Sequence, residues 1–129
     1  MPGAGGKAGG DRERVLAALR EAGAEPPAVV ELAASFPGLD VPGILRFLAR
    51  EGRVVAVGKD RYYEAGVLKE ERDRLVAALR ELGPATASAI RERLGRSRKF
   101  VIPLLEWADR EGVTIRSGDT RSAGPGAGA

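Results

Sequence analysis

The sequence contains no cysteine and no histidine. Disulfide bonds, zinc sites with the usual ligands, and acid/base catalysis by histidine are therefore excluded. It also lacks an apolar run of roughly 18 residues, the length that spans a bilayer. The N-terminal MPGAGGKAGG has no apolar centre of the kind found in signal peptides. These absences remove most small-enzyme functions and predict a cytoplasmic protein with no membrane partner.

Motifs for nucleotide or metal chemistry are missing as well. The two Gly-Lys pairs are followed by Ala8 and Asp60, so neither completes a phosphate-binding loop of the form GxxxxGK[ST]. The carboxylates of Glu106, Asp109 and Glu111 lack the spacing of a metal site or of paired catalytic acids, and we expect them to face solvent or hold arginines. The sequence thus predicts no catalytic, metal-binding or cofactor-binding residue in this chain.

Charge is distributed unevenly along the 129 residues, whose formal net charge is +3. Residues 11–82 hold 12 Lys/Arg against 13 Asp/Glu, a balance of −1, whereas residues 83–129 hold 8 against 5, a balance of +3. The excess is greatest between Arg91 and Lys99, where five cations accompany one acid, Glu92. An anionic partner would therefore meet the C-terminal part of the chain.

An internal repeat organises the chain. At an offset of 60 residues, AALREAG at 17–23 aligns with AALRELG at 77–83. Similarity at a fixed spacing is typical of a repeated structural unit. We therefore expect a flexible Gly-rich tail at 1–10, a first unit at 11–66, a second unit at 67–122 and a flexible tail at 123–129.

Each unit shows three helical patterns followed by β character. Apolar residues recur at helical spacing in each pattern, and Gly23 and Gly83 end the first one in the two units. Thr86 is predicted to cap the second helix of the second unit, and Gly95 to end that helix. Pro103 predicts that the third helix there begins near Phe100 or kinks. Short hairpins are expected at 53–57 with 61–64 and at 113–116 with 120–121.

The order of these elements predicts the fold of each unit, and their periodicity predicts the core residues. Three helices closed by a two-stranded hairpin form a winged helix-turn-helix unit. The predicted fold is therefore mainly α with small β-hairpins, as tandem winged helix-turn-helix units, and a plain helical bundle is the alternative. The expected core residues are Val15, Leu16, Leu19, Val41, Ile44, Leu45 and Leu48 in the first unit, and Leu68, Leu75, Leu79, Leu82, Ile90, Leu94, Val101, Leu104, Leu105, Trp107 and Ala108 in the second.

The most distinctive cluster is Arg96, Ser97, Arg98 and Lys99, where the third helix of the second unit should begin. Free N–H groups at a helix N-terminus attract anions, and adjacent Arg and Lys side chains would complete a phosphate site. The first unit has Pro-Gly-Leu at 37–39 in place of Ser-Arg-Lys, so the fold does not require this cluster. A solvated charged surface is the alternative interpretation.

The second hairpin carries Thr114, Arg116 and Arg121 beside a Ser-Gly-Asp turn. Such a wing can lie along a nucleic-acid backbone, because the planar guanidinium of arginine matches phosphate oxygens. Arginines that only keep the strand soluble are the alternative. Because residues 123–129 are Gly- and Ala-rich, we expect either an unusual natural C-terminus or a short wing.

Residues 97–121, SRKFVIPLLEWADREGVTIRSGDTR, resemble the last winged helix of bacterial selenocysteine-specific translation elongation factors. The preceding residues 11–66 resemble the penultimate winged helix, chiefly through the internal repeat. The shared features are Ser97-Arg98-Lys99, Leu104-Leu105-Glu106 followed by an aromatic residue and Asp109, and then Thr114, Arg116, Gly118-Asp119 and Arg121.

The resemblance implies that this chain is the C-terminal part of such a factor. It would bind an mRNA hairpin beside a UGA codon, while N-terminal domains absent here hold GTP and selenocysteyl-tRNA and work with the ribosome. We expect a monomer that is not an enzyme, with residues 11–66 as a support. A-form RNA hides its major-groove edges, so contacts to the backbone and to loop bases are expected. The predicted RNA-binding residues are Arg96, Ser97, Arg98, Lys99, Thr114, Arg116 and Arg121.

Two other functions suit the predicted fold. A DNA-binding regulator would place its third helix in a major groove and usually dimerises, but Glu106 and Asp109 on the outer side of this helix oppose groove insertion. A protein-interaction tandem would make no nucleic-acid contact. It predicts that removing the charges of Arg98 and Lys99 changes nothing important.

Overall fold

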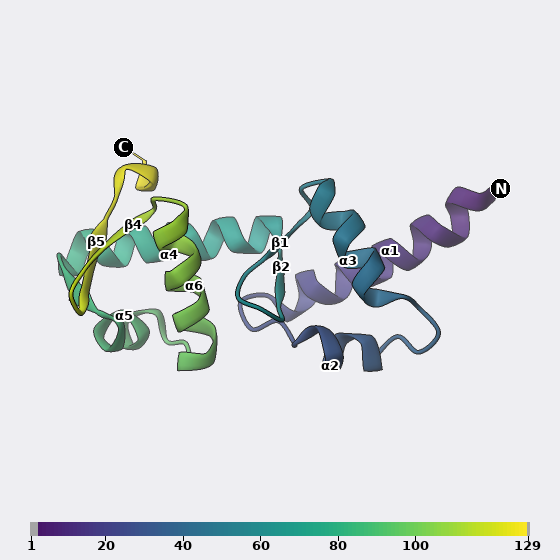
Figure 1. The fold of residues 1–129 in the computed structure, drawn as a ribbon, viewed down its shortest axis with the longest axis horizontal. Coiled ribbons are helices and arrows are strands. Elements are labelled where there is room, and N and C mark those ends of the chain that lie inside the picture. The colour runs from purple at the N-terminus through teal and green to yellow at the C-terminus, as the bar shows by residue number, and fades with distance from the viewer. Residues whose placement is uncertain (1–2, 129) are drawn as a thin grey trace. The chain divides into compact units, whose positions relative to one another are not determined.

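The computed structural model describes the backbone of residues 3–128 and the side chains of residues 9–128. The chain forms two compact units, Met1–Leu68 and Lys69–Ala129. Each is mainly helical with a small antiparallel hairpin (Figure 1). The predicted fold, tandem winged helix-turn-helix units, is confirmed. None of the helices in the described part is long and apolar enough to cross a membrane.

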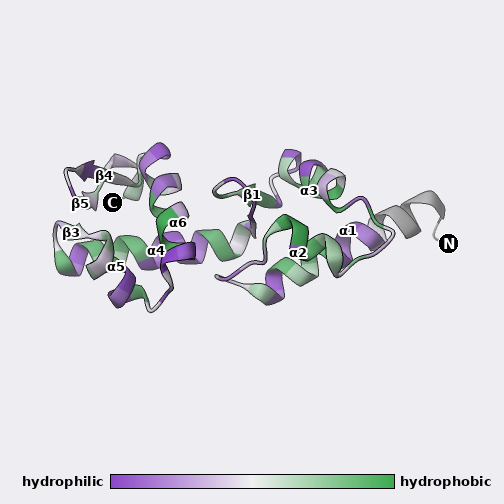
Figure 2. Ribbon diagram, turned by 60° about the horizontal axis from the view of Figure 1, so that its bottom comes forward, coloured by the Kyte–Doolittle hydropathy of each residue, from purple (hydrophilic) through white to green (hydrophobic). Residues whose placement is uncertain are grey.

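Unit 1 packs its helices around a small apolar core. Val15, Leu16 and Leu19 of α1 are buried with Leu45 and Leu48 of α3. Figure 2 shows both hydrophobic and hydrophilic residues along α2 and α3, as expected for helices with one buried face. The elements are α1 (Gly3–Ala22), α2 (Val29–Ala34), α3 (Val41–Arg50), β1 (Val54–Ala56) and β2 (Tyr62–Glu64).

The N-terminal residues differ from the sequence-based expectation. A flexible tail is expected at 1–10, but residues 3–10 form the first turns of α1, and residues 1–2 lie outside the described part. Once a helix is anchored by packed residues such as Val15, each added residue gains a hydrogen bond without a new nucleation step. Composition alone, rich in glycine, does not reveal that anchor.

Unit 2 has its own core, formed by all three helices. Leu75 and Leu79 of α4, Ile90 of α5, and Val101 and Leu105 of α6 are buried together. Helix α4 begins within unit 1 and continues into unit 2. The elements are α4 (Ala65–Leu82), β3 (Ala85–Thr86), α5 (Ala87–Leu94), α6 (Arg98–Arg110), β4 (Thr114–Ser117), β5 (Thr120–Ala123) and the 3-10 helix η1 (Pro125–Ala127).

Three predicted core positions in unit 2 have partial exposure: Leu82, Leu94 and Trp107. Leu82 is 43% exposed, so its assignment to the core is wrong. It is the last residue of α4, and the chain turns away at Gly83, whose φ is +71°. Leu94 and Trp107 are partly buried and pack against the core.

The sheet of unit 2 has a third strand that the sequence did not predict. Strand order is β3-β5-β4, with Ala85 opposite Arg121 and Thr86 opposite Thr120. A strand of two residues is too short to show alternation. The repeat position of Thr86 in unit 1 is Pro26, which has no N–H to donate to a strand. The third strand therefore distinguishes the second wing from the first.

A short turn joins α5 to α6. Thr86 caps α5 as predicted, because its hydroxyl accepts the N–H of Ala89 at 3.1 Å. Gly95 ends α5 at a φ of +69°, a conformation that side chains disfavour. Helix α6 then begins at Arg98, with Ser97 as its N-cap and Pro103 inside it. Of the two expectations for Pro103, a start near Phe100 differs from the observed start by two residues, and a kink at Pro103 stays a prediction.

The C-terminal segment is packed on unit 2 (Figure 1). Strand β5 runs to Ala123, so the wing is longer than expected, and η1 follows it. Ala127 is buried in the core, and the N–H of Gly126 donates to the carbonyl of Gly112 at 2.7 Å. Arg80 of α4 donates to the Gly128 carbonyl at 3.0 Å. The expected flexible tail at 123–129 is therefore wrong for the described residues, because contacts with distant segments hold it.

Candidate nucleic-acid interface

The N-terminal end of α6 exposes three of the seven predicted RNA-binding residues: Ser97, Arg98 and Lys99. The Ser97 carbonyl accepts the N–H groups of Phe100 and Val101. The N–H groups of Arg98 and Lys99 precede these first helical hydrogen bonds and point outward, as at any helix start. The Ser97 hydroxyl makes no capping hydrogen bond. This end thus offers hydrogen-bond donors and two cations to an anion.

The equivalent end of α3 in unit 1 has the opposite character. Its N-cap is Asp40, whose carboxylate accepts the N–H of Gly43 at 3.1 Å. A carboxylate at this position occupies the donors and repels a phosphate. The hollow beside it is lined by residues of both charges, including Asp11 and Arg12. The donors and cations exposed at the start of α6 therefore have no counterpart at the start of α3.

Arg96 has a different environment from its neighbours. Its Nε–H and Nη2–H donate to the two carboxylate oxygens of Glu71, both at 3.0 Å. The Glu71 side chain is 6% exposed and that of Arg96 22%. Arg96 is thus held on α4, while Ser97, Arg98 and Lys99 face solvent. Glu71 could not be predicted as the partner of Arg96, because helix periodicity does not show which residues 25 positions apart will meet.

Thr114 and Arg121 in the wing are both bound to Asp109 of α6. The Thr114 hydroxyl donates to Oδ1 of Asp109 at 2.6 Å. Arg121 donates Nε–H to Oδ1 at 3.0 Å and Nη2–H to Oδ2 at 2.9 Å. Both Thr114 and Arg121 are buried. They therefore fasten the wing to α6, and the expectation that Asp109 holds an arginine is confirmed.

The pKa of Asp109 reflects this arrangement. Partial burial by itself would raise the pKa, since it disfavours the charged carboxylate. Hydrogen bonds from Arg121 and Thr114, with the positive charges of Arg121 and Arg116, outweigh burial and lower the pKa below its ordinary value. Asp109 therefore stays ionised at neutral pH.

Arg116 is the exposed cation of the wing. It lies opposite Arg121 across the β4–β5 hairpin. Its Nε–H donates to the carbonyl of Gly118 at 3.0 Å, which holds the guanidinium beside the hairpin turn. Unlike Thr114 and Arg121, it is accessible to a ligand.

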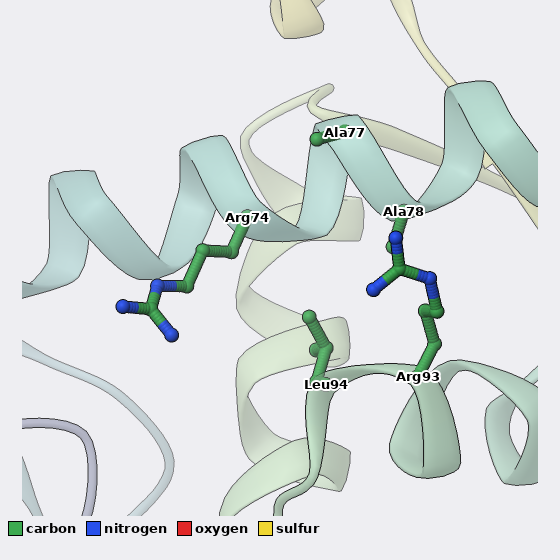
Figure 3. A pocket seen from close by; sticks show the side chains of 5 residues that line it. All are labelled: Arg74, Ala77, Ala78, Arg93 and Leu94. Atoms are coloured by element: carbon green, nitrogen blue, oxygen red, sulfur yellow. The ribbon is translucent and has the colours of Figure 1, made fainter.

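A small groove of about 200 Å³ separates α4 from α5 in unit 2. Figure 3 shows Leu94 at the end of α5, with Arg74 and Arg93 on either side of it. Ala77 and Ala78 of α4 complete the lining. The groove is smaller than the roughly 300–1,000 Å³ of typical small-molecule sites. Arg93 was visible in the sequence as part of the basic excess, but Arg74 was not.

Comparison with known proteins finds similarity to selenocysteine-specific elongation factors. A family model described as "Elongation factor SelB, winged helix" matches residues 77–122. The selenocysteine-specific elongation factor of Escherichia coli (strain K12) is 39% identical over 75 residues, or 58% of this chain and 12% of that protein. That of Desulfomicrobium baculatum is 34% identical over 89 residues, or 64% of this chain and 13% of that protein. The chain thus spans only about an eighth of these relatives.

Two solved structures share the fold. One is the mRNA-binding domain of elongation factor SelB from E. coli in complex with SECIS RNA, with a TM-score of 0.72 and 32% identity. The match covers 88% of this chain and 96% of that one. The other is bacterial selenocysteine-specific elongation factor EF-Sec, with a TM-score of 0.68, 24% identity and coverage of 88% and 18%. This second likeness shows the fold alone.

Proposed function

Because the chain belongs to the winged-helix family of elongation factor SelB, we propose that it binds an mRNA hairpin, a selenocysteine insertion element. In doing so it tethers a selenocysteine-specific elongation factor beside a UGA codon. The single observation that carries this proposal is the basic N-terminal end of α6, which offers donors and cations where unit 1 has a carboxylate. The structure of the mRNA-binding domain of E. coli SelB, whose match covers 88% of this chain, is in complex with SECIS RNA. That complex supports the same function.

The predicted residues divide into two roles in this proposal. Arg98, Lys99 and Arg116 are exposed and contact phosphates, while Ser97 supplies its hydroxyl and nearby N–H groups. A-form RNA is recognised through its backbone and through bases that leave the stem, so a compact basic surface suits a hairpin. Arg96, Thr114 and Arg121 hold the binding surface in place through Glu71 and Asp109.

Unit 1 serves as a support in the proposed function. Its α3 begins at Asp40 and presents no counterpart of the basic cluster. In the complete factor, domains outside this chain bind GTP and selenocysteyl-tRNA and work with the ribosome. The chain itself acts in the cytoplasm as a monomer that binds RNA and performs no catalysis.

Fluorescence anisotropy tests the proposal. The chain is titrated at near-physiological salt into a hairpin from beside a selenocysteine UGA codon, a loop-scrambled hairpin and a DNA duplex. We expect tight binding to the native hairpin alone, with affinity falling steeply as salt rises. Equal or tighter binding to duplex DNA would instead indicate a DNA-binding regulator. Failure to bind any of the three would favour a protein-interaction module.

A matched pair of variants assigns the surface. Arg98→Ala/Lys99→Ala should weaken hairpin binding and reduce the slope of log K against log salt by about 2, one for each lost phosphate contact. Arg46→Ala/Lys59→Ala removes the same charge from exposed positions of unit 1. This control should change affinity little. Equal losses in both variants would mean that only net charge matters.

A further inference from the structure

The ion pair between Glu71 and Arg96 is an unusual feature of unit 2. Glu71 lies in α4, and its residue is only 5% exposed. Its carboxylate accepts two parallel hydrogen bonds from Arg96, and Nε of Arg74 lies 3.8 Å from Oε2. Two parallel N–H···O bonds fix the guanidinium in direction as well as in distance. The side chain of Arg96 is therefore held in one orientation.

Stability alone does not explain this pair. Taking two charges out of water costs about as much free energy as their attraction returns, and apolar replacements of such pairs are often equally stable. Unit 1 forms the corresponding turn without this ion pair. At the repeat position of Arg96 it has Phe36, and Asp11 at the repeat position of Glu71 pairs with Arg14 instead. The Arg14 guanidinium lies 5.3 Å from the Phe36 ring.

The ion pair lies at the turn between α5 and α6, next to the exposed basic residues. Arg96 is the middle residue of the turn between Gly95, which ends α5, and Ser97, which caps α6. Fixing the Arg96 side chain on α4 restricts the backbone on both sides of it. Arg98 and Lys99 come directly after Ser97, so the positions of their N–H groups depend on this restricted backbone. A ligand-binding turn held in its bound geometry loses less entropy when the ligand arrives.

We propose that Glu71 is a positioning residue for RNA binding: it holds Arg96 so that the α5–α6 turn presents Ser97, Arg98 and Lys99 to the hairpin backbone. This inference rests on the proposed function and deepens it. Arg96 then acts through the turn and makes no phosphate contact of its own. Unit 1, which binds no hairpin in this proposal, has no need of the pair.

The test uses Glu71→Gln in the full chain, with Glu70→Gln as its control. Both variants remove one negative charge from neighbouring positions of α4, but Glu70 is exposed. Charge alone would tighten RNA binding in both. We expect Glu71→Gln to weaken binding to the native hairpin about tenfold or more with an unchanged salt slope, and Glu70→Gln to bind as tightly as the wild type or slightly more tightly.

A second variant separates positioning from folding. Glu71→Leu/Arg96→Phe replaces the ion pair by two apolar side chains, one of which, phenylalanine, stands in unit 1 at the repeat position of Arg96. We expect its Tm to stay near that of the wild type while hairpin affinity falls as in Glu71→Gln. The salt slope should also be unchanged, whereas a phosphate contact by Arg96 would reduce it by about 1.

The outcomes distinguish this inference from the proposed function. Tight hairpin binding by the wild type and by Glu71→Gln alike would overturn the positioning role and leave the proposed function intact. A salt slope lowered in the double variant would assign Arg96 to direct phosphate contact and also overturn it. A wild-type chain that ignores the hairpin would overturn both.

Discussion

Two arginines that face each other across the wing illustrate how much a single residue's surroundings matter. Arg121 is buried against Asp109, whereas Arg116 is exposed. Arg121→Ala should lower the free energy of unfolding by about 1.5–3 kcal/mol, since it removes hydrogen bonds between charged groups. Arg116→Ala should change it by less than about 0.5 kcal/mol, as expected for a surface position. Urea denaturation of both variants measures the difference.

For RNA binding the order of the two variants should reverse: where both are folded, Arg116→Ala should have the larger effect. Arg116→Ala should weaken hairpin binding and lower the salt slope by about 1. A large loss of stability in Arg116→Ala, or none in Arg121→Ala, would contradict the roles assigned here.

The lowered pKa of Asp109 predicts how stability depends on pH. A carboxyl group whose pKa is lower in the folded state stabilises the fold fully above its unfolded-state pKa, and this contribution disappears as pH falls through the folded-state pKa. The stability lost in Asp109→Asn should therefore be largest near neutral pH and shrink below about pH 4. Urea denaturation of both proteins from pH 7 to pH 3 tests this. A difference that stays constant over this range would contradict it.

At the residue scale, the sequence predicted where cations gather but not which of them are free to bind. Ser97, Arg98 and Lys99 could be singled out because the repeat supplied a comparison within the chain. The ion pair between Arg96 and Glu71 could not be predicted, since the two residues lie 25 positions apart. Partners at that distance are brought together by helix packing, which no local pattern contains.

Among the elements, the C-terminal segment packs so closely that it allows a specific prediction. A Cβ at Gly124 would lie 2.5 Å from the carbonyl oxygen of Gly112, so the backbone must shift. We expect Gly124→Ala to destabilise unit 2 by about 1–3 kcal/mol, the usual cost of overpacking. Gly10→Ala in α1 meets nothing within 4 Å and should stabilise its helix by about 0.5–1 kcal/mol.

Thermal unfolding of these two glycine variants compares like with like, because each adds one methyl group. Opposite shifts in Tm are expected. If both variants melted alike, the close packing of the C-terminal segment on unit 2 would be contradicted.

The helices were predictable because their signals are local. Thr86 and Gly95 mark the two ends of α5 by their chemistry, and both assignments are confirmed. Strand β3 was missed because it forms only where β5 provides a partner. The segment at 123–129 was expected to be flexible from its composition, yet Ala127 is buried and Arg80 binds the Gly128 carbonyl. Composition describes a segment's own preferences and not its neighbours.

For the molecule as a whole, the two units have separate cores. Leu45 is fully buried in unit 1 and Leu105 in unit 2. Each Leu→Ala change should cost about 2–5 kcal/mol in its own unit. Since the proposed binding surface lies in unit 2, Leu45→Ala should leave hairpin affinity within about twofold, whereas Leu105→Ala should weaken binding once unit 2 begins to unfold.

Hydrogen exchange with and without the hairpin can locate these effects by unit. Loss of protection confined to unit 1 in Leu45→Ala, with normal RNA affinity, would agree with a supporting role for that unit. A large loss of affinity in Leu45→Ala would show that unit 1 takes part in binding.

The sequence by itself determined the two repeated units, their helices and the location of the basic cluster. These follow from periodicity, capping residues and a comparison of the two copies, all of which can be read along the chain. Only the tertiary structure decided which of the predicted residues are exposed and which hold others in place. Glu71 and Asp109 reach Arg96 and Arg121 across the fold, and a charge is neutralised by whatever lies near it in space.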